Sequence, residues 1–286
     1  MAREHGWPEA PEPLPRPVID SHTHLDVHDR SLHGDDAPDP AQLLLWAAEV
    51  GVPKVVQIGC DVESAEWSVP FAREHSNVTV GVALHPNDAA RIGVRQGRVA
   101  LEQAWQRIDE LARDSVVSAV GETGLDYFRT PDAEGQEIQH ESFRWHIELA
   151  KELDKTLVIH DRDSHEDVIS ILLEQGTPDR VVFHCFSGDA QMARVCAEHG
   201  WFMSFAGVIT FGSAEGLREA LHVVPDDLLL VETDAPYLTP KPNRGRVNAT
   251  YLMPWTVRRM AEERGADVAE LCDVLVANTY RAFGDW

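Results

Sequence analysis

The chain has 286 residues, with 48 acidic and 25 basic side chains and a formal net charge of −23. Hydrophobic residues make up 43% and charged residues 26%, a globular composition that excludes disorder over most of the length. No apolar run approaches about 18 residues, and no basic segment followed by an apolar core opens the chain, so neither a membrane span nor a secretory signal is expected. The sequence predicts a cytoplasmic protein without an obligate protein partner. Its acidity argues against binding nucleic acid through a generally basic surface.

Cysteine spacing excludes two common classes of small scaffold. None of the four cysteines forms a C-x-x-C pair, and their spacing fits neither a disulfide framework nor a zinc ribbon. We therefore expect buried thiols in a reducing compartment.

The N-terminal residues 1–17 contain five prolines and no periodic apolar pattern, which predicts an extended tail before one domain over residues 18–286. Short β-branched runs then alternate with helical stretches. The expected strands are 17–20, 54–58, 78–82, 116–120, 156–159, 180–183, 201–204 and 228–231.

Helical periodicity fills the intervals between these strands. Phe143, Ile147 and Ala150, for example, fall at i, i+4 and i+7 and share one helix face. The other expected helices are 41–50, 63–75, 99–113, 165–175, 190–199, 215–222, 255–264 and 267–283.

Eight strands alternating with helices predict an α/β fold, a single (β/α)8 TIM barrel. The competing fold is a doubly wound open sheet. That fold usually has a glycine-rich phosphate turn after its first strand, and none is present here.

Imidazoles and carboxylates follow most of the expected strands. In a barrel the C-terminal ends of the strands meet at one face, where active sites lie, so these residues are expected in one pocket. They are His22 and His24 after the first strand, His85 after the third, Glu122 after the fourth, His160 after the fifth, His184 after the sixth and Asp234 after the eighth.

These side chains predict a metal centre. His22 and His24 are two residues apart, so both can point to the same side of an extended chain and reach one cation. Four histidines and two carboxylates exceed the ligands of one tetrahedral site and suit two divalent cations that share a bridging carboxylate, which we assign to Glu122. Two such cations would make the site locally positive and attract a phosphate despite the acidic chain.

The sequence resembles the TatD family of metal-dependent deoxyribonucleases, within the wider amidohydrolase-like barrels. The resemblance covers about residues 18–284, in the family's order. The matching motifs are Asp20-Ser21-His22-Thr23-His24, Gly121-Glu122-Thr123-Gly124-Leu125-Asp126-Tyr127, His184-Cys185-Phe186-Ser187-Gly188, Glu232-Thr233-Asp234-Ala235-Pro236-Tyr237-Leu238, Arg244-Gly245-Arg246 and Asn278-Thr279-Tyr280-Arg281-Ala282-Phe283-Gly284.

The resemblance implies a barrel, a binuclear centre and 3′→5′ exonuclease action on DNA, with His85 near the substrate phosphate. The native metals would be Mg, Mn or Zn. By the family pattern one metal takes His22, His24, Glu122 and Asp234, and the other takes Glu122, His160 and His184.

Two positions depart from the family pattern. Asn87 stands where members often have a second histidine, and Asn248-Ala249-Thr250 stands where they often have Asn-Glu-Pro. Neither departure touches a metal ligand, so both bear on substrate positioning.

The predicted reaction is hydrolysis of a phosphodiester, with Asp234 as the general base. His85 and Arg162 are expected to hold non-bridging phosphate oxygens. The loop 239–250 contains Arg244 and Arg246 and no acid, so we expect it to contact the backbone of a single-stranded DNA or oligonucleotide substrate.

Other functions fit the same residues. A binuclear lactonase, amidohydrolase or ester hydrolase could use the same centre on a carbonyl, and an aminoacyl-tRNA deacylase lies between the two chemistries. No lysine occupies an expected ligand position, which favours the TatD interpretation over barrels with a modified bridging lysine. A non-catalytic scaffold would not need a complete ligand set.

Overall fold

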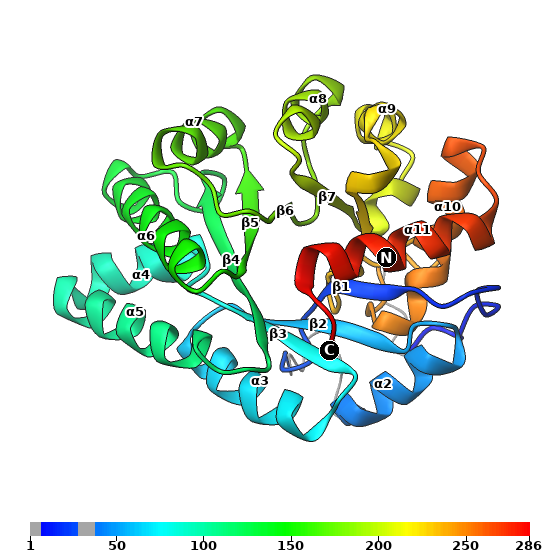
Figure 1. Ribbon diagram of the computed structural model, residues 1–286, viewed down its shortest axis with the longest axis horizontal. Coiled ribbons are helices and arrows are strands. Elements are labelled where there is room, and N and C mark those ends of the chain that lie inside the picture. The colour runs from blue at the N-terminus through cyan, green and yellow to red at the C-terminus, as the bar shows by residue number, and fades with distance from the viewer. Residues whose placement is uncertain (1–6, 28–37) are drawn as a thin grey trace. The chain divides into compact units, whose positions relative to one another are not determined.

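The computed structural model describes residues 7–27 and 38–286, so the first six residues of the expected tail lie outside the described part (Figure 1). The chain divides into two compact units. Unit 1 comprises Met1–Gln57 and Gly188–Arg281, and unit 2 comprises Ile58–Ser187 and Ala282–Trp286.

Eight strands are ordered β1 to β8 in one sheet, as the chain runs, and the pairs β1–β2, β3–β4, β4–β5, β5–β6 and β7–β8 are parallel. This order, with helices between successive strands, is the connectivity of a (β/α)8 barrel and confirms the expected fold class. The strands are β1 (Ile19–Thr23), β2 (Lys54–Gly59), β3 (Val78–Val82), β4 (Val117–Asp126), β5 (Thr156–Arg162), β6 (Val181–Phe183), β7 (Phe202–Phe205) and β8 (Leu229–Val231).

Helices alternate with the strands along the chain. Three short 3₁₀ helices, η1 (Gly207–Thr210), η2 (Asp226–Leu228) and η3 (Thr250–Leu252), lie in the C-terminal half. The α-helices are α2 (Pro40–Glu49), α3 (Val62–Glu74), α4 (Pro86–Gln96), α5 (Arg98–Ala112), α6 (Ala133–Glu152), α7 (His165–Gln175), α8 (Ala190–Glu198), α9 (Glu215–Val223), α10 (Met253–Arg264) and α11 (Val268–Phe283).

All eight expected strands are present, but β4 and β5 extend beyond their expected ends. Their pairing resumes after an irregularity at Gly121 and Glu122 and continues to the partners Asp126 and Arg162. The extensions consist mostly of glycine and polar residues, so they cannot be recognised as β-branched runs. Glu122 and His160 therefore lie within strands, whereas the sequence placed them after the strands. The same holds for His22, because β1 also extends beyond its expected end, to Thr23.

The sequence missed helix α4. Its buried face consists of the small residues Pro86, Ala89 and Ala90, without large apolar side chains. Local signals still start it, because Pro86 occupies the first turn and the His85 side chain accepts a hydrogen bond from Asn87 N, capping the helix.

Within unit 1, β1 contacts both β2 and β8. Ile19 pairs with Lys54 on one side, and on the other Asp234 N, just after β8, donates to His22 O. These contacts bring the segments that follow β1 and β8 together.

The described part of the N-terminal tail packs against unit 1. It contains no helix or strand, but Leu14 N donates to Val50 O, and Tyr251 and Arg258 donate to the carbonyls of Pro8 and Glu12. The described part of the tail is thus held to unit 1 at several points.

The expectations about cysteines and about membrane-spanning helices can be compared with this structure. All four cysteines are free thiols, and two of them, Cys196 and Cys272, are buried. Among the described residues, no helix is long and apolar enough to cross a membrane.

Candidate metal centre

Unit 2 gathers three imidazoles around one carboxylate oxygen. Glu122 Oε1, from β4, lies 2.5 Å from His160 Nδ1, 2.8 Å from His184 Nε2 and 3.6 Å from His85 Nε2. The carboxylate is buried, with 4% of the residue exposed. The structure thus brings together four predicted site residues that are separated by up to 99 positions in the sequence (184 − 85).

Asp126 orients His160 from the opposite side of the ring. Asp126 Oδ2 lies 3.2 Å from His160 Nε2, and it also accepts a hydrogen bond of 2.8 Å from Asn87 Nδ2. A carboxylate that accepts the Nε2–H bond leaves the Nδ1 lone pair directed at the other side, where Glu122 lies. Asn87, one of the departures from the family pattern, therefore holds the carboxylate that holds a predicted ligand.

His85 has one ring nitrogen committed to the backbone. Its Nδ1 accepts the bond from Asn87 N at 3.2 Å, which assigns the proton to Nε2 in the neutral ring. Burial, reinforced by the positive charge on His160, lowers the pKa of His85 to about 3. His85 is thus a neutral donor at physiological pH, and its N–H group faces the Glu122 side of the group.

The ionisable side chains of this group shift one another's pKa values. Burial opposes ionisation of Glu122, but His184, His85 and His160 more than offset it, and the pKa of Glu122 falls well below its usual value. Burial likewise opposes protonation of His160, yet Glu122 and Asp126 raise its pKa above the usual value. Both ring nitrogens of His160 therefore face carboxylates, which stabilise the protonated form of the ring.

A divalent cation fits this group by donor chemistry. Ligand atoms of Glu122, His160 and His184 lie within 4.8 Å of one another. Two imidazole nitrogens and a carboxylate oxygen are a ligand set typical of zinc and similar borderline metals. A cation would replace the proton on His160, because the same nitrogen must be deprotonated to bind it.

Unit 1 holds a second group of donors. His22 Nε2 and His24 Nε2 lie 3.2 Å apart, and Asp234 Oδ1 lies 3.3 Å from His24 Nε2 and 3.8 Å from His22 Nε2. Both imidazoles come from the end of β1, and the carboxylate follows β8. The three side chains are predicted ligands. The close approach of two imidazoles and a carboxylate also suits a cation.

Asp20 stabilises the backbone beneath this second group. It is fully buried and accepts hydrogen bonds from Thr233 N and Thr233 Oγ1, at 2.9 and 2.5 Å, so it joins β1 to the segment after β8. Burial raises the pKa of Asp20 to about 7. Asp234, the residue after Thr233, adopts a left-handed backbone conformation with φ of 53°.

The predicted substrate contacts are less concentrated. The Arg162 guanidinium lies over the Phe128 ring in unit 2, 4.0 Å from its centroid, and Arg244 lies 4.4 Å from the Phe211 ring in unit 1. Arg246 Nη2 instead donates to Trp7 O at 2.9 Å, so this guanidinium anchors the N-terminal tail.

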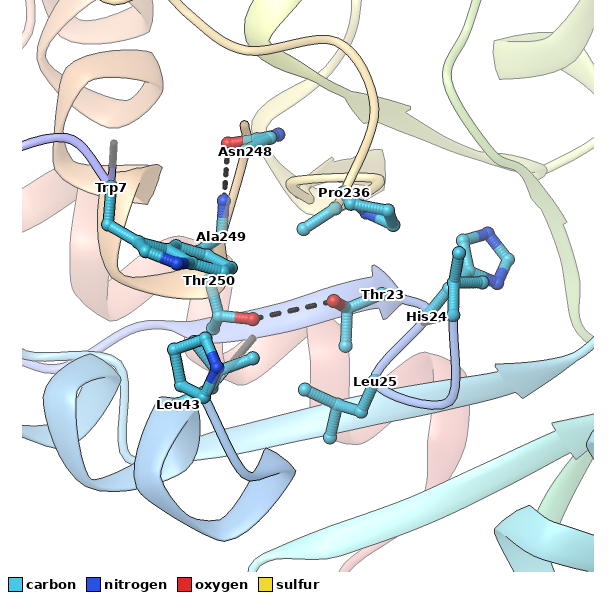
Figure 2. A pocket seen from close by; sticks show the side chains of 12 residues that line it. Trp7, Thr23, His24, Leu25, Leu43, Pro236, Asn248, Ala249 and Thr250 are labelled. Atoms are coloured by element: carbon cyan, nitrogen blue, oxygen red, sulfur yellow. Dashed lines mark hydrogen bonds between the residues drawn. The ribbon is translucent and has the colours of Figure 1, made fainter. Parts of the chain in front are cut away.

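A small pocket in unit 1 lies beside His24 (Figure 2). The Trp7 indole lies close to Ala249 and Thr250, and Thr250 Oγ1 lies 3.4 Å from Thr23 Oγ1. The pocket has a free volume of about 20 Å³, which suffices for about one water molecule. The residues that depart from the family pattern in this loop thus form a wall with the tail, and Arg246 and Tyr251 fix the tail there.

The sequence did not single out Asp126 or Asn87. Asp126 was visible only as the last acid of the Gly-Leu-Asp motif, and Asn87 only as a departure from a pattern. Phe128 follows Asp126 by two residues, and Arg162 follows His160 by two residues, on the neighbouring strands β4 and β5 or just after them. This spacing carries no signal in the sequence alone.

A family model described as TatD related DNase matches residues 19–284, nearly the whole chain. The chain belongs to this family. The match begins after the N-terminal tail, so Trp7 and the segment it anchors lie outside the part of the chain that the family model covers.

Curated TatD relatives match over nearly their full length. The chain is 40% identical over 270 residues to "Uncharacterized metal-dependent hydrolase TatD" of Mycobacterium tuberculosis, covering 93% of this chain and 98% of the relative. It is 35% identical over 271 residues to "Uncharacterized metal-dependent hydrolase YcfH" of Escherichia coli, covering 93% and 95%. The protein is therefore a TatD-family metal-dependent hydrolase.

Solved structures agree with the fold. The TatD homologue YJJV from Escherichia coli K12 superposes with a TM-score of 0.82 at 26% identity and covers 93% of this chain and 97% of that one. An organophosphorus hydrolase from Deinococcus radiodurans, with a TM-score of 0.60 at 16% identity and coverage of 93% and 92%, shares the fold.

Proposed function

We propose that the protein is a divalent-metal-dependent 3′→5′ exodeoxyribonuclease that acts on single-stranded DNA or oligonucleotides. The observation that carries the proposal is the buried Glu122 oxygen faced by His160, His184 and His85, in a chain that a TatD-related DNase model matches over residues 19–284. Borderline metals held by such ligands support hydrolysis of phosphodiesters.

Each donor group has a proposed place in the centre. Glu122, His160 and His184 would hold one cation. The second cation is proposed from the sequence, which assigns it to His22, His24 and Asp234 with Glu122 as the shared ligand. The cations supply Lewis acidity, which lowers the pKa of water and polarises the phosphoryl group.

The chain's own side chains carry the remaining steps. Asp234 orients the attacking water and accepts its proton as general base. The neutral His85 donates its Nε2–H to a non-bridging phosphate oxygen, a role supported by the commitment of its Nδ1 to Asn87 N. Asp126 keeps the His160 ring in the orientation that presents Nδ1.

The test is a degradation assay on a single-stranded DNA labelled at its 5′ end. Metal-loaded protein is expected to shorten the strand stepwise from the 3′ end, and chelator is expected to stop it. Asp234→Asn, which keeps an oxygen donor but loses the base, is expected to retain substantial metal and to lose roughly 10²-fold or more in turnover.

Two controls make the assay decisive. A strand with a phosphorothioate linkage at its 3′ end should resist a 3′ exonuclease, and a lactone or an aminoacyl ester should remain uncleaved. Rapid cleavage of such an ester, with no release of nucleotides from DNA, would contradict the proposal and favour the carbonyl-directed alternative.

A further inference from the structure

An exposed aromatic side chain follows the strand that carries Glu122 and Asp126. Phe128 follows β4 by two residues and is 61% exposed. Among the described residues, Phe128 and Tyr237 are the aromatic members of the exposed large hydrophobic side chains, whereas Leu45, Val94, Val99 and Leu173 lie on helices. Scattered exposed apolar residues are ordinary, so exposure alone assigns no role to Phe128.

The loop that carries Phe128 is held firmly on both sides of the ring. Tyr127 N donates to Arg162 O at 3.0 Å, and Tyr127 Oη donates to Asp167 Oδ2 at 2.5 Å. After the ring, Arg129 N donates to Asp126 Oδ1 at 2.8 Å. The backbone is therefore fixed while the Phe128 side chain stays 61% exposed, an arrangement that suits a preorganised contact residue.

One guanidinium contacts this ring, and a second arginine follows it in the chain; neither has a carboxylate partner among the described residues. The Arg162 guanidinium lies over Phe128 at 4.0 Å, and within the described residues neither Arg162 nor the adjacent Arg129 forms an ion pair. Most other arginines of unit 2 do, as Arg98, Arg113 and Arg144 illustrate. In a chain with 48 acids, guanidinium groups without carboxylates are available to an external anion.

The ring lies next to the metal ligands along the chain and across the sheet. Asp126, which contacts His160, and Arg162 are register partners on β4 and β5. Phe128 and Arg162 each stand two residues beyond one member of the Asp126–His160 pair, a span of at most about 7 Å along an extended chain. A nucleotide whose phosphate lies at the donor group is therefore within reach of the ring.

We propose that Phe128 is a stacking platform for a nucleobase of the substrate strand, with Arg162 and Arg129 supplying positive charge to the adjacent phosphates. Every base presents a flat π surface, so the contact would tolerate any sequence, as an exonuclease requires. This inference rests on the proposed nuclease function and adds to it the residue that recognises the base.

The test compares Phe128 variants on an intact strand and on one with abasic residues at its last three 3′ positions. Loss of a base–aromatic stack is expected to raise KM for the intact strand by about 5- to 100-fold in Phe128→Ala, with kcat changed little. Phe128→Trp should retain or improve the wild-type KM, and Phe128→Leu should resemble Phe128→Ala. On the abasic strand all variants should agree within about twofold.

Binding measured without turnover provides a second readout. Fluorescence anisotropy of a labelled strand in the presence of chelator should show the same loss for Phe128→Ala, and the same indifference when the bases are absent. The matched control is Leu173→Ala, which removes a hydrophobic side chain that is 52% exposed on α7 of the same unit and should change nothing.

The outcomes separate this inference from the proposed function. If the wild-type protein degrades DNA but Phe128→Ala behaves as the wild type, or loses equally on abasic DNA, Phe128 is an ordinary exposed residue and the inference alone is overturned. If the wild-type protein neither binds nor degrades any strand, the proposed function fails and the platform fails with it.

Discussion

Gly124 in β4 is the residue whose replacement tests the geometry of the unit 2 donor group most sharply. Its φ is +133°, and a Cβ built on it would lie 2.1 Å from His160 O. Gly124→Ala therefore introduces two faults, a backbone conformation unsuited to alanine and a collision with the strand that carries His160. Since the obstacle is backbone, it cannot rotate away.

The expected cost follows from these two faults. An unfavourable backbone conformation costs roughly 1–3 kcal/mol. Overpacking costs about 1–3 kcal/mol more, so the free energy of unfolding should fall by about 2–6 kcal/mol, a large share of the roughly 5–15 kcal/mol that stabilises a typical domain. At about 2–4 °C per kcal/mol, the melting temperature should fall by roughly 5–20 °C.

Substitutions at two other glycines distinguish the cost of the backbone conformation from the cost of the collision. Gly97 has a φ of +87° but no described heavy atom within 4 Å of its Cβ position, so Gly97→Ala should show the backbone cost alone. Gly216, in α9, has neither a positive φ nor a described neighbour within 4 Å. Gly216→Ala should be neutral or stabilising by up to about 1 kcal/mol, as expected for alanine in a helix.

The assay is thermal unfolding by circular dichroism, paired with calorimetric titration of Zn²⁺ or Mn²⁺. Gly124→Ala should lose the most stability and should also bind metal more weakly, because His160 is displaced. Equal melting temperatures for Gly124→Ala and Gly97→Ala, with unchanged metal affinity, would refute the close approach of β4 to His160 as the constraint.

Three further predictions concern pH, the tail and the basic loop. Because burial lowers the folded-state pKa of His146 from 6.5 to about 3, stability should be full above pH 6.5 and fall towards pH 3 by about 1.4 kcal/mol per pH unit; denaturant titrations should show that His146→Gln lacks this component. Tyr251→Phe, which removes the hydrogen bond to Pro8 O, should cost about 0.5–1.5 kcal/mol and speed proteolysis of the tail; unchanged proteolysis would show that the tail is held elsewhere. Arg244→Ala should flatten the slope of log affinity for single-stranded DNA against log salt by about 0.7, and an unchanged slope would remove Arg244 from the phosphate contacts. Arg246→Ala should also lower the melting temperature, because its guanidinium anchors Trp7.

The alternation of elements could be predicted because the strands contain short, buried apolar runs and most helices have a buried face with large apolar side chains. The ends of β4 and β5 could not be predicted, since their final residues, up to Asp126 and Arg162, are polar and their pairing is set by the partner strand. Helix α4 escaped for a similar reason: its start depends on the His85 cap rather than on periodicity.

The ligand candidates could be predicted because the chemistry of a metal site demands imidazoles and carboxylates, and strand ends place them on one face. Residues that act through a ligand carry no such signature. Asp126 could be any structural acid until the 3.2 Å contact with His160 is known, and Asn87 could be a simple replacement until its amide is seen to hold Asp126. The anchoring role of Arg246 depends on the tail, which no periodic pattern places.

The central claim, a metal centre organised by Glu122, is tested most directly by elemental analysis of protein loaded with Zn²⁺ or Mn²⁺ and then desalted. The wild-type protein should retain up to two ions per chain, and Glu122→Gln, which removes the charge faced by His160 and His184, should lose most of them. Glu102→Gln, an exposed substitution on α5, should match the wild-type content. Full retention by Glu122→Gln, or none by the wild-type protein, would contradict the account.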